Sequence, residues 1–105
     1  MPDKLLQALE GTDYPWVHFG WSEAPAGDYG VYAEDGSNDL DADDVHSERA
    51  AVIVLDLFTR DDSGAPQAAV EAALDGIEGC AWYVNSIQFE KDTGYIHFEW
   101  ICEVA

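Results

Sequence analysis

The sequence of residues 48–60, Glu-Arg-Ala-Ala-Val-Ile-Val-Leu-Asp-Leu-Phe-Thr-Arg, decides the expected fold. Residues 50–55 are six apolar residues in a row, and three of them are consecutive β-branched residues. When consecutive residues are all apolar, both faces of a strand are apolar, which is typical of a strand covered on both faces. The β-branched residues favour a strand over a buried helix. The turn-forming residues 60–64 agree with this interpretation. We therefore expect residues 49–59 to form a central strand with the other elements packed around it.

One helix is expected on each side of this strand in the sequence. Their apolar faces are formed by Leu5, Leu6 and Leu9 in the first helix and by Val70, Leu74 and Ile77 in the second. Asp3 and Ser63 are possible helix caps, and Pro66 suits the first turn of the second helix. Gly11 and Gly76 are placed to end the two helices.

Four further strands are expected, at residues 14–21, 29–34, 82–90 and 95–104. If residues 91–94 form the loop of the last hairpin, Glu90 pairs with Tyr95, and the pairs that follow place one apolar face opposite one mixed face. In this register Cys102 lies opposite Tyr83 and not Cys80, so no intrachain disulfide is expected. A slip of one residue would exchange the two faces.

The expected order of elements is α-β-β-β-α-β-β. Two helices on one face of a mainly antiparallel sheet make an α+β fold. The chain has 105 residues, which predicts a single domain over residues 1–105, with a long acidic loop at about 35–48.

The charge is strongly unbalanced, with 22 acidic and 4 basic residues and a net charge of −18. Such a field repels phosphates, so no direct binding of nucleic acid is expected. A basic protein partner, cations, or a surface along which DNA passes without binding remain compatible with it. The beginning of the chain does not resemble a signal peptide, and no apolar run is long enough to span a membrane, so an intracellular protein is expected.

The acidic loop suggests a metal site, but its spacing does not match a known one. An EF-hand loop that starts at Asp39 needs Gly at its sixth place and Glu at its twelfth, and this chain has Asp44 and Ala50 there. We expect no specific metal and no cofactor, only weak association of cations with a solvated loop.

No catalytic pattern is visible, so the sequence does not predict an enzyme. The three histidines are isolated in the sequence, and no serine lies in a nucleophile-elbow pattern. His97 falls on the mixed face of the last hairpin, where a surface or interface role is expected. Trp16 and Trp82 also fall on the less apolar faces, and tryptophan is enriched at protein–protein hot spots.

Several phrases, in their order and spacing, resemble the tail terminator or tail-completion proteins of long-tailed phages and prophages of Gram-positive bacteria. These phrases are Pro25 followed by Tyr29-Gly-Val-Tyr32, Asp35-Gly-Ser-Asn38, Ala42-Asp43, Val54-Leu-Asp-Leu-Phe-Thr59, the helix at residues 71–74 and Tyr95-Ile-His-Phe-Glu99. The similarity extends over nearly the whole chain. The family usually has more basic residues, and an aromatic residue is common where this chain has Val45 and His46.

The resemblance implies a structural component of the virion and not an enzyme. Family members typically form a hexameric ring on the tail tube, where the ring stops tube growth and meets the head-tail connector. The implied location is the host cytoplasm during assembly and then the virion tail. The implied partners are further copies of the chain, the tail tube protein and the connector.

A head-to-tail ring needs two different complementary surfaces on each subunit. The candidate interface residues are Asp39, Asp41, Asp43, Asp44, Val45, His46, Trp82 and His97. The alternative from another class is an acidic protein that mimics DNA and binds a basic DNA-binding protein, which the net charge favours.

Overall fold

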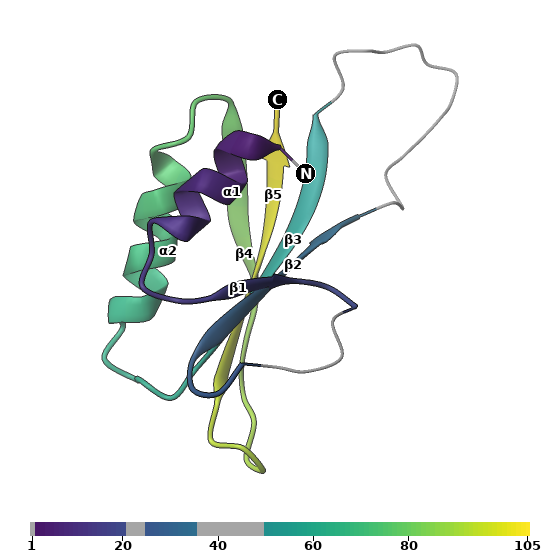
Figure 1. Ribbon diagram of the computed structural model, residues 1–105. Coiled ribbons are helices and arrows are strands. Elements are labelled where there is room, and N and C mark those ends of the chain that lie inside the picture. Colours follow the sequence, from purple (N-terminus) through teal and green to yellow (C-terminus); the bar gives the residue numbers. More distant parts are fainter. Residues whose placement is uncertain (1, 21–24, 36–49) are drawn as a thin grey trace.

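The protein is an α+β structure in which a five-stranded mixed sheet carries two helices (Figure 1). The computed structural model describes residues 2–20, 25–35 and 50–105. The elements are α1 (Asp3–Glu10), β1 (Trp16–His18), β2 (Tyr29–Glu34), β3 (Ala51–Thr59), α2 (Ala65–Asp75), β4 (Cys80–Phe89) and β5 (Ile96–Val104). Within the described residues, these elements follow the predicted order, with boundaries that differ by a few residues.

The strands lie in the order β1-β2-β3-β5-β4, with β3 at the centre as predicted. Three of the strand pairs are antiparallel, but β1 runs parallel to β2. The sheet is therefore mixed. The expectation of a mainly antiparallel sheet holds for β2, β3, β5 and β4 but not for β1.

Both helices lie on the same face of the sheet, as predicted (Figure 1). The core lies between this face and the helices, because the apolar residues of α1 and α2 bury themselves against alternate residues of the strands. Its fully or nearly fully buried members are Leu5, Leu9, Ile53, Leu55, Leu57, Val70, Leu74, Ile77, Phe98, Trp100, Cys102 and Val104. We call this side of the sheet the covered face.

The prediction that the central strand is covered on both faces is wrong for the described residues. Along β3, buried residues alternate with half-buried ones: Ile53, Leu55 and Leu57 are buried, whereas Val52, Val54 and Asp56 between them are not. Both helices pack on one face, so the other face of β3 receives no helix. The apolar run in the sequence thus reflects a strand with one covered face and one apolar face that is open.

The helix ends differ in detail from those expected. Helix α1 starts after Pro2, and Asp3 lies inside its first turn without capping it through a side-chain hydrogen bond. Helix α2 starts after Gly64, whose φ of 92° favours glycine, and the Ser63 hydroxyl accepts a hydrogen bond from Ala65 N at 3.2 Å. The two glycines expected to follow the helices do so: Gly11 follows α1 and Gly76 follows α2.

The predicted register of the last hairpin is correct near the loop and wrong beyond Ser86. Phe89 faces Ile96 and Ile87 faces Phe98, but a bulge at Asn85 shifts the pairing so that Tyr83 faces Ile101. A bulge adds one residue to one strand, so every β4 side chain before the bulge lies on the face opposite to the one predicted. The pairs before the bulge are Cys80 with Val104, Ala81 with Glu103, Trp82 with Cys102, Tyr83 with Ile101 and Val84 with Trp100. Both cysteines are free thiols, and burial raises the pKa of Cys102 to about 12.

Candidate functional site

The sheet face opposite the helices, which we call the open face, combines apolar side chains with acidic ones. Strand pairing places its residues in rows across β2, β3, β5 and β4. One row is Ala33, Val54, Ile101 and Tyr83; the next is Val31, Asp56, Glu99 and Ser86; and a third is Tyr29, Phe58, His97 and Gln88. These side chains are half-buried or exposed, and no helix of the described residues covers them, so this face is the candidate site.

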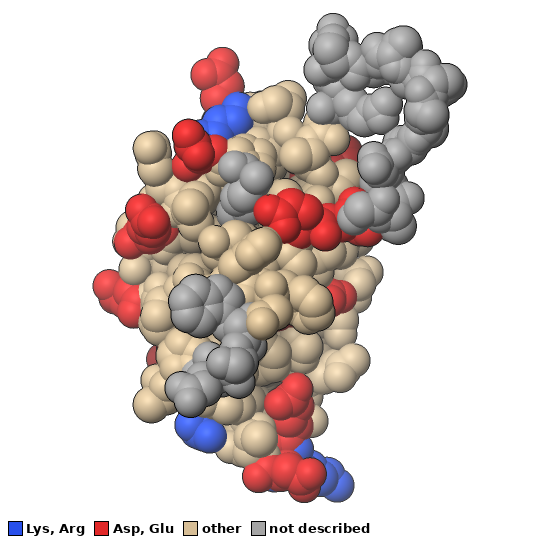
Figure 2. All heavy atoms as spheres, turned by 45° about the vertical axis from the view of Figure 1, so that its right-hand side comes forward, with Lys and Arg blue, Asp and Glu red and all other residues tan. Residues whose placement is uncertain are grey.

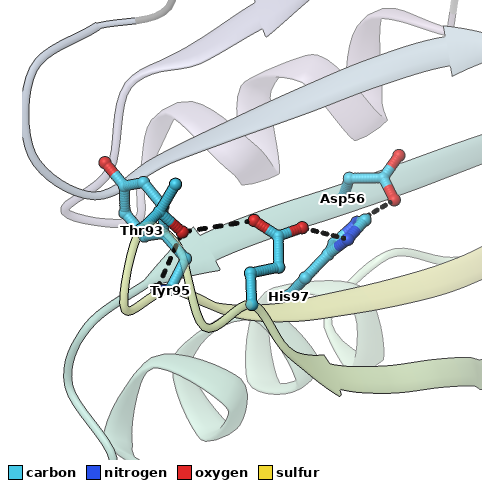
Figure 3. Close-up of polar contacts among 5 residues, drawn as sticks. Asp56, Thr93, Tyr95 and His97 are labelled. Atoms are coloured by element: carbon cyan, nitrogen blue, oxygen red, sulfur yellow. Dashed lines mark hydrogen bonds and ion pairs between the residues drawn. The ribbon is translucent and has the colours of Figure 1, made fainter.

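A histidine held by carboxylates lies on the open face, close to the loop of the last hairpin (Figure 3). His97 Nε2 is 2.7 Å from Asp56 Oδ1, and His97 Nδ1 is 3.4 Å from Glu90 Oε2. The ring also stacks on Phe58, with centroids 4.2 Å apart. These contacts come from both ring nitrogens and one ring face, so the imidazole is fixed in orientation.

The Asp56 carboxyl lies partly buried on this face, beside the Glu99 carboxylate and the His97 ring. Burial raises its pKa above the ordinary value of 3.8, and the neighbouring Glu99 carboxylate adds to the rise, while the hydrogen bond to His97 opposes it. Asn85 Nδ2 donates a hydrogen bond to Glu99 Oε1 at 2.7 Å, so the bulge residue joins the same polar row. The row therefore crosses β3, β5 and β4 and places two carboxyl groups side by side.

An aromatic cluster continues the open face toward the hairpin loop. Tyr29 stacks on Phe58 at 4.8 Å between centroids, and Tyr95 meets both rings edge-on at 5.9 and 6.0 Å. The Arg60 guanidinium lies 4.0 Å from the Tyr95 ring centroid, and Arg60 Nε donates to Thr93 O at 2.9 Å. This end of the open face is therefore ordered by stacking and hydrogen bonds.

His97 lies on the open face, as predicted, but Trp82 does not lie beside it. The bulge at Asn85 turns Trp82 to the covered face, where it packs against the core and donates from Nε1 to Asp75 Oδ1 at 2.9 Å. The two candidate residues of the last hairpin are therefore on opposite faces of the sheet. The other six candidates, which are Asp39, Asp41, Asp43, Asp44, Val45 and His46, lie outside the described residues together with most of the predicted acidic loop.

Trp16 was also expected on a less apolar face and is instead part of the covered side. Its ring packs over Gly30, and a Cβ built on that glycine would be 2.3 Å from the ring. Trp16 Nε1 donates to Thr12 Oγ1 at 3.0 Å. The alternation predicted within β1 is correct, but the face that it presents to the core is the one with Trp16 and His18.

Sequence reasoning missed Asp56, Phe58 and Glu99 as members of the site. A signal was present, because Asp56 is the only charged residue between positions 50 and 59. A carboxylate within an apolar strand marks the alternate positions whose side chains face water, since burying an unpaired charge is costly. Phe58 lies on the same face of the strand as Asp56, and strand pairing places His97 and Glu99 on that face as well.

The described part of the chain offers few other sites. It contains no group of three or more His, Cys, Asp or Glu side chains placed to hold a metal ion. A shallow hollow between α1 and α2 is lined mainly by small residues: Ala8, Gly11, Thr12, Asp13, Ala69, Ala72 and Ala73. None of the helices in the described ranges is both long and apolar enough to cross a membrane.

Figure 2 shows acidic residues in separate groups around broad uncharged areas, with few basic residues on that side. The charged groups on this side of the molecule are therefore mostly acidic. No family model matches the chain, and a comparison with curated proteins finds no match either.

Proposed function

We propose that the protein is a structural component of a phage tail, which forms a ring on the end of the tail tube and joins the tube to the head connector. The observation that carries this proposal is the sheet with one covered and one open face. Helices bury one face into a stable core, while the apolar and acidic open face is left for contact outside the subunit. The resemblance to tail terminator proteins gives this contact its expected partners: neighbouring copies, the tube protein and the connector.

The charge supports a ring through which DNA passes. A net charge of −18 on each subunit makes the assembly as a whole unfavourable for binding phosphates. A DNA molecule that moves through such a ring is repelled by its wall and does not bind to it. In this proposal the protein is not an enzyme, it acts in the host cytoplasm during assembly, and it ends in the virion tail.

Absolute mass in solution is the first test. We expect a species near six subunits in light scattering, favoured by high salt because salt screens the repulsion between acidic subunits. The protein should also shorten or stop tubes of purified tail tube protein, measured as tube length in electron micrographs. A protein that remains monomeric with its tube present, and leaves tube length unchanged, would contradict the proposal.

The alternative function is that of an acidic inhibitor that binds a basic DNA-binding protein. The observation in its favour is the same net charge of −18. It predicts salt-sensitive capture of basic nucleases or repressors by a monomer, whereas the tail proposal predicts no such capture. A pull-down at low and high salt distinguishes the two.

A further inference from the structure

The two edges of the sheet are formed by β1 and β4. Among the described residues, no strand pairs with the outer side of either one. An edge strand presents unpaired N–H and C=O groups and can therefore accept a strand from another chain. Charged side chains on an edge strand are one of several features that make such pairing unfavourable.

Neither β1 nor β4 contains an Asp, Glu, Lys or Arg side chain. Residues 79–89, which include β4, are the longest stretch of the chain without Asp, Glu, Lys or Arg, at eleven residues. Residues 14–22, which include β1, are the second longest, at nine residues. In a chain with a net charge of −18, the two longest uncharged stretches thus coincide with the two sheet edges. Two copies can meet along these edges without placing like charges opposite each other.

We propose that the β4 edge of one copy pairs with the β1 edge of the next copy, so that the sheet continues from subunit to subunit around the ring. This inference rests on the proposed function, whose interface it identifies. The pairing directions make β1 parallel to β2 and β5, and antiparallel to β3 and β4. Where neighbouring subunits share the same orientation along the ring axis, as in a cyclic ring, β4 meets the next β1 antiparallel.

The register matches at the junction. Following the paired residues across the sheet, Trp16 is level with Ile87 and His18 is level with Val84. Gly30 N donates to Pro15 O and Phe19 N donates to Tyr32 O, both at 2.8 Å, so the alternation of the ladder turns the backbone groups of Trp16 and His18 outward.

The other edge shows the matching alternation. Glu90 N donates to Tyr95 O at 2.8 Å and Ala105 N donates to Gly79 O at 2.9 Å. These bonds fix which residues of β4 point toward β5, and the residues between them, including Ile87 and Val84, turn their backbone groups outward. Two outward pairs are therefore level with each other at opposite edges: Trp16 with Ile87, and His18 with Val84.

Exposed aromatic side chains complete the match. Phe19 is 72% exposed and follows directly after β1, and Tyr83 is 56% exposed on β4. Phe19 comes one residue after His18, and Tyr83 comes one row after Val84 in the same direction, so the two are level at opposite edges. A head-to-tail junction brings Phe19 of one copy against Tyr83 of the next and buries both.

The same features favour a second copy over another kind of partner. A basic or acidic protein would gain no ion pair on these edges, because the strands contain no charged side chain. The edges match each other in level, in outward backbone groups and in exposed aromatic residues. A two-fold contact between two β4 edges would instead leave β1 and Phe19 without a role.

Disulfide trapping tests the junction. In a background with Cys80→Ser, the double variant Phe19→Cys with Tyr83→Cys is oxidised and separated on a denaturing gel without reductant. We expect most of the protein in bands larger than a dimer, because each subunit then carries both halves of the junction. The matched control pairs Phe19→Cys with Val54→Cys, which lies in the same row at the centre of the sheet, and it should give no such ladder.

The single variants decide the symmetry. Phe19→Cys alone and Tyr83→Cys alone should each remain monomeric on the gel, since a head-to-tail junction never brings two identical positions together. A strong dimer from Tyr83→Cys alone would overturn the proposal in favour of a two-fold contact. The absence of a ladder from the double variant would also overturn the proposed junction. Light scattering of the Cys80→Ser protein then tests whether the ring itself forms. A mass near six subunits would leave the proposed ring intact with a different junction, whereas a monomer with its tube present would contradict the ring as well.

Discussion

The covered and open faces of the sheet are built from alternate residues of the same strands, yet they serve different purposes. On β3, Leu55 is fully buried beneath the helices, whereas its neighbour Val54 is half-buried on the face that carries no helix. Hydrophobic burial on the first face stabilises the subunit, because apolar area removed from water contributes roughly 25 cal/mol per Å². On the second face the same kind of side chain contributes less to folding, because it stays partly exposed.

Polar groups divide in the same way. In the core of the covered face, the indole N–H of the buried Trp100 donates to Glu71 Oε2 at 3.0 Å, so a single bond satisfies it. The open face instead has a connected polar group in which His97 contacts both Asp56 and Glu90. Polar and charged groups on a partly accessible face stabilise folding weakly and can discriminate between partners.

The largest expected effect comes from removing a core side chain of β3. Leu55→Ala should lower the free energy of unfolding by about 2–5 kcal/mol, because it leaves a cavity among residues that are packed on all sides. The matched control is Val54→Ala, the neighbouring residue on the open face, with an expected loss of about 1 kcal/mol. Urea unfolding followed by tryptophan fluorescence measures both values. Equal losses would mean that the two faces are equally covered.

A smaller effect is expected where the covered face ends at β1. Gly30→Ala places a Cβ 2.3 Å from the Trp16 ring, so the ring must move away. Overpacking of this kind costs about 1–3 kcal/mol. Gly76→Ala is the control, because its Cβ would lie at an ordinary contact distance of 3.6 Å from the nearest atom and its φ is −82°. The contrast fails if thermal unfolding shifts by the same amount in both variants.

Sequence reasoning reached the order of elements, the central place of β3 and the bounds of β2, since these follow from apolar periodicity and turn residues. It could not predict that β1 pairs parallel to β2, because that depends on the path of the chain between them. It also overestimated the length of β1, which Pro15 precedes and Gly20, with φ of 104°, closely follows. The preceding proline and this positive φ shorten the strand.

The bulge at Asn85 explains why the candidate site was predicted only in part. Up to Ser86 the hairpin register was correct, so His97 was placed on the right face. Beyond it, one extra residue moved Trp82 to the core. No feature of the sequence marks Asn85 as a bulge, because its side chain fits either face of an edge strand. The charge pattern, in contrast, was readable, although the topology was needed to show that its two longest uncharged stretches are edges.

A modest effect is expected at the aromatic end of the open face. Arg60→Ala removes a cation that lies over the Tyr95 ring and a hydrogen bond to Thr93 O. At a site this exposed the loss should be about 0.5–1 kcal/mol. Arg60→Lys is the control, because it keeps the positive charge but not the planar group that stacks on the ring. Chemical unfolding at moderate salt measures the difference, and a loss above that of Gly30→Ala would show that this cluster is part of the folding core.

The smallest effect on the free energy of unfolding at neutral pH is expected for Asp56→Asn. This variant is informative because its stability relative to the wild type should depend on pH. The pKa of Asp56 is raised in the folded state, so at neutral pH the folded protein holds a carboxylate that is less well solvated than in the unfolded chain. As pH falls through the raised folded value, the folded state takes up the proton first and the wild type gains stability relative to the variant. This gain is complete below the ordinary value of 3.8, where the unfolded chain is protonated as well. Urea unfolding of both proteins from pH 7 down to 3.5 should therefore show the wild type gaining on the variant only at the acidic end. A difference that stays constant with pH would mean that Asp56 is as well solvated as an ordinary surface carboxylate, and the open face would then be more accessible to water than its contacts indicate.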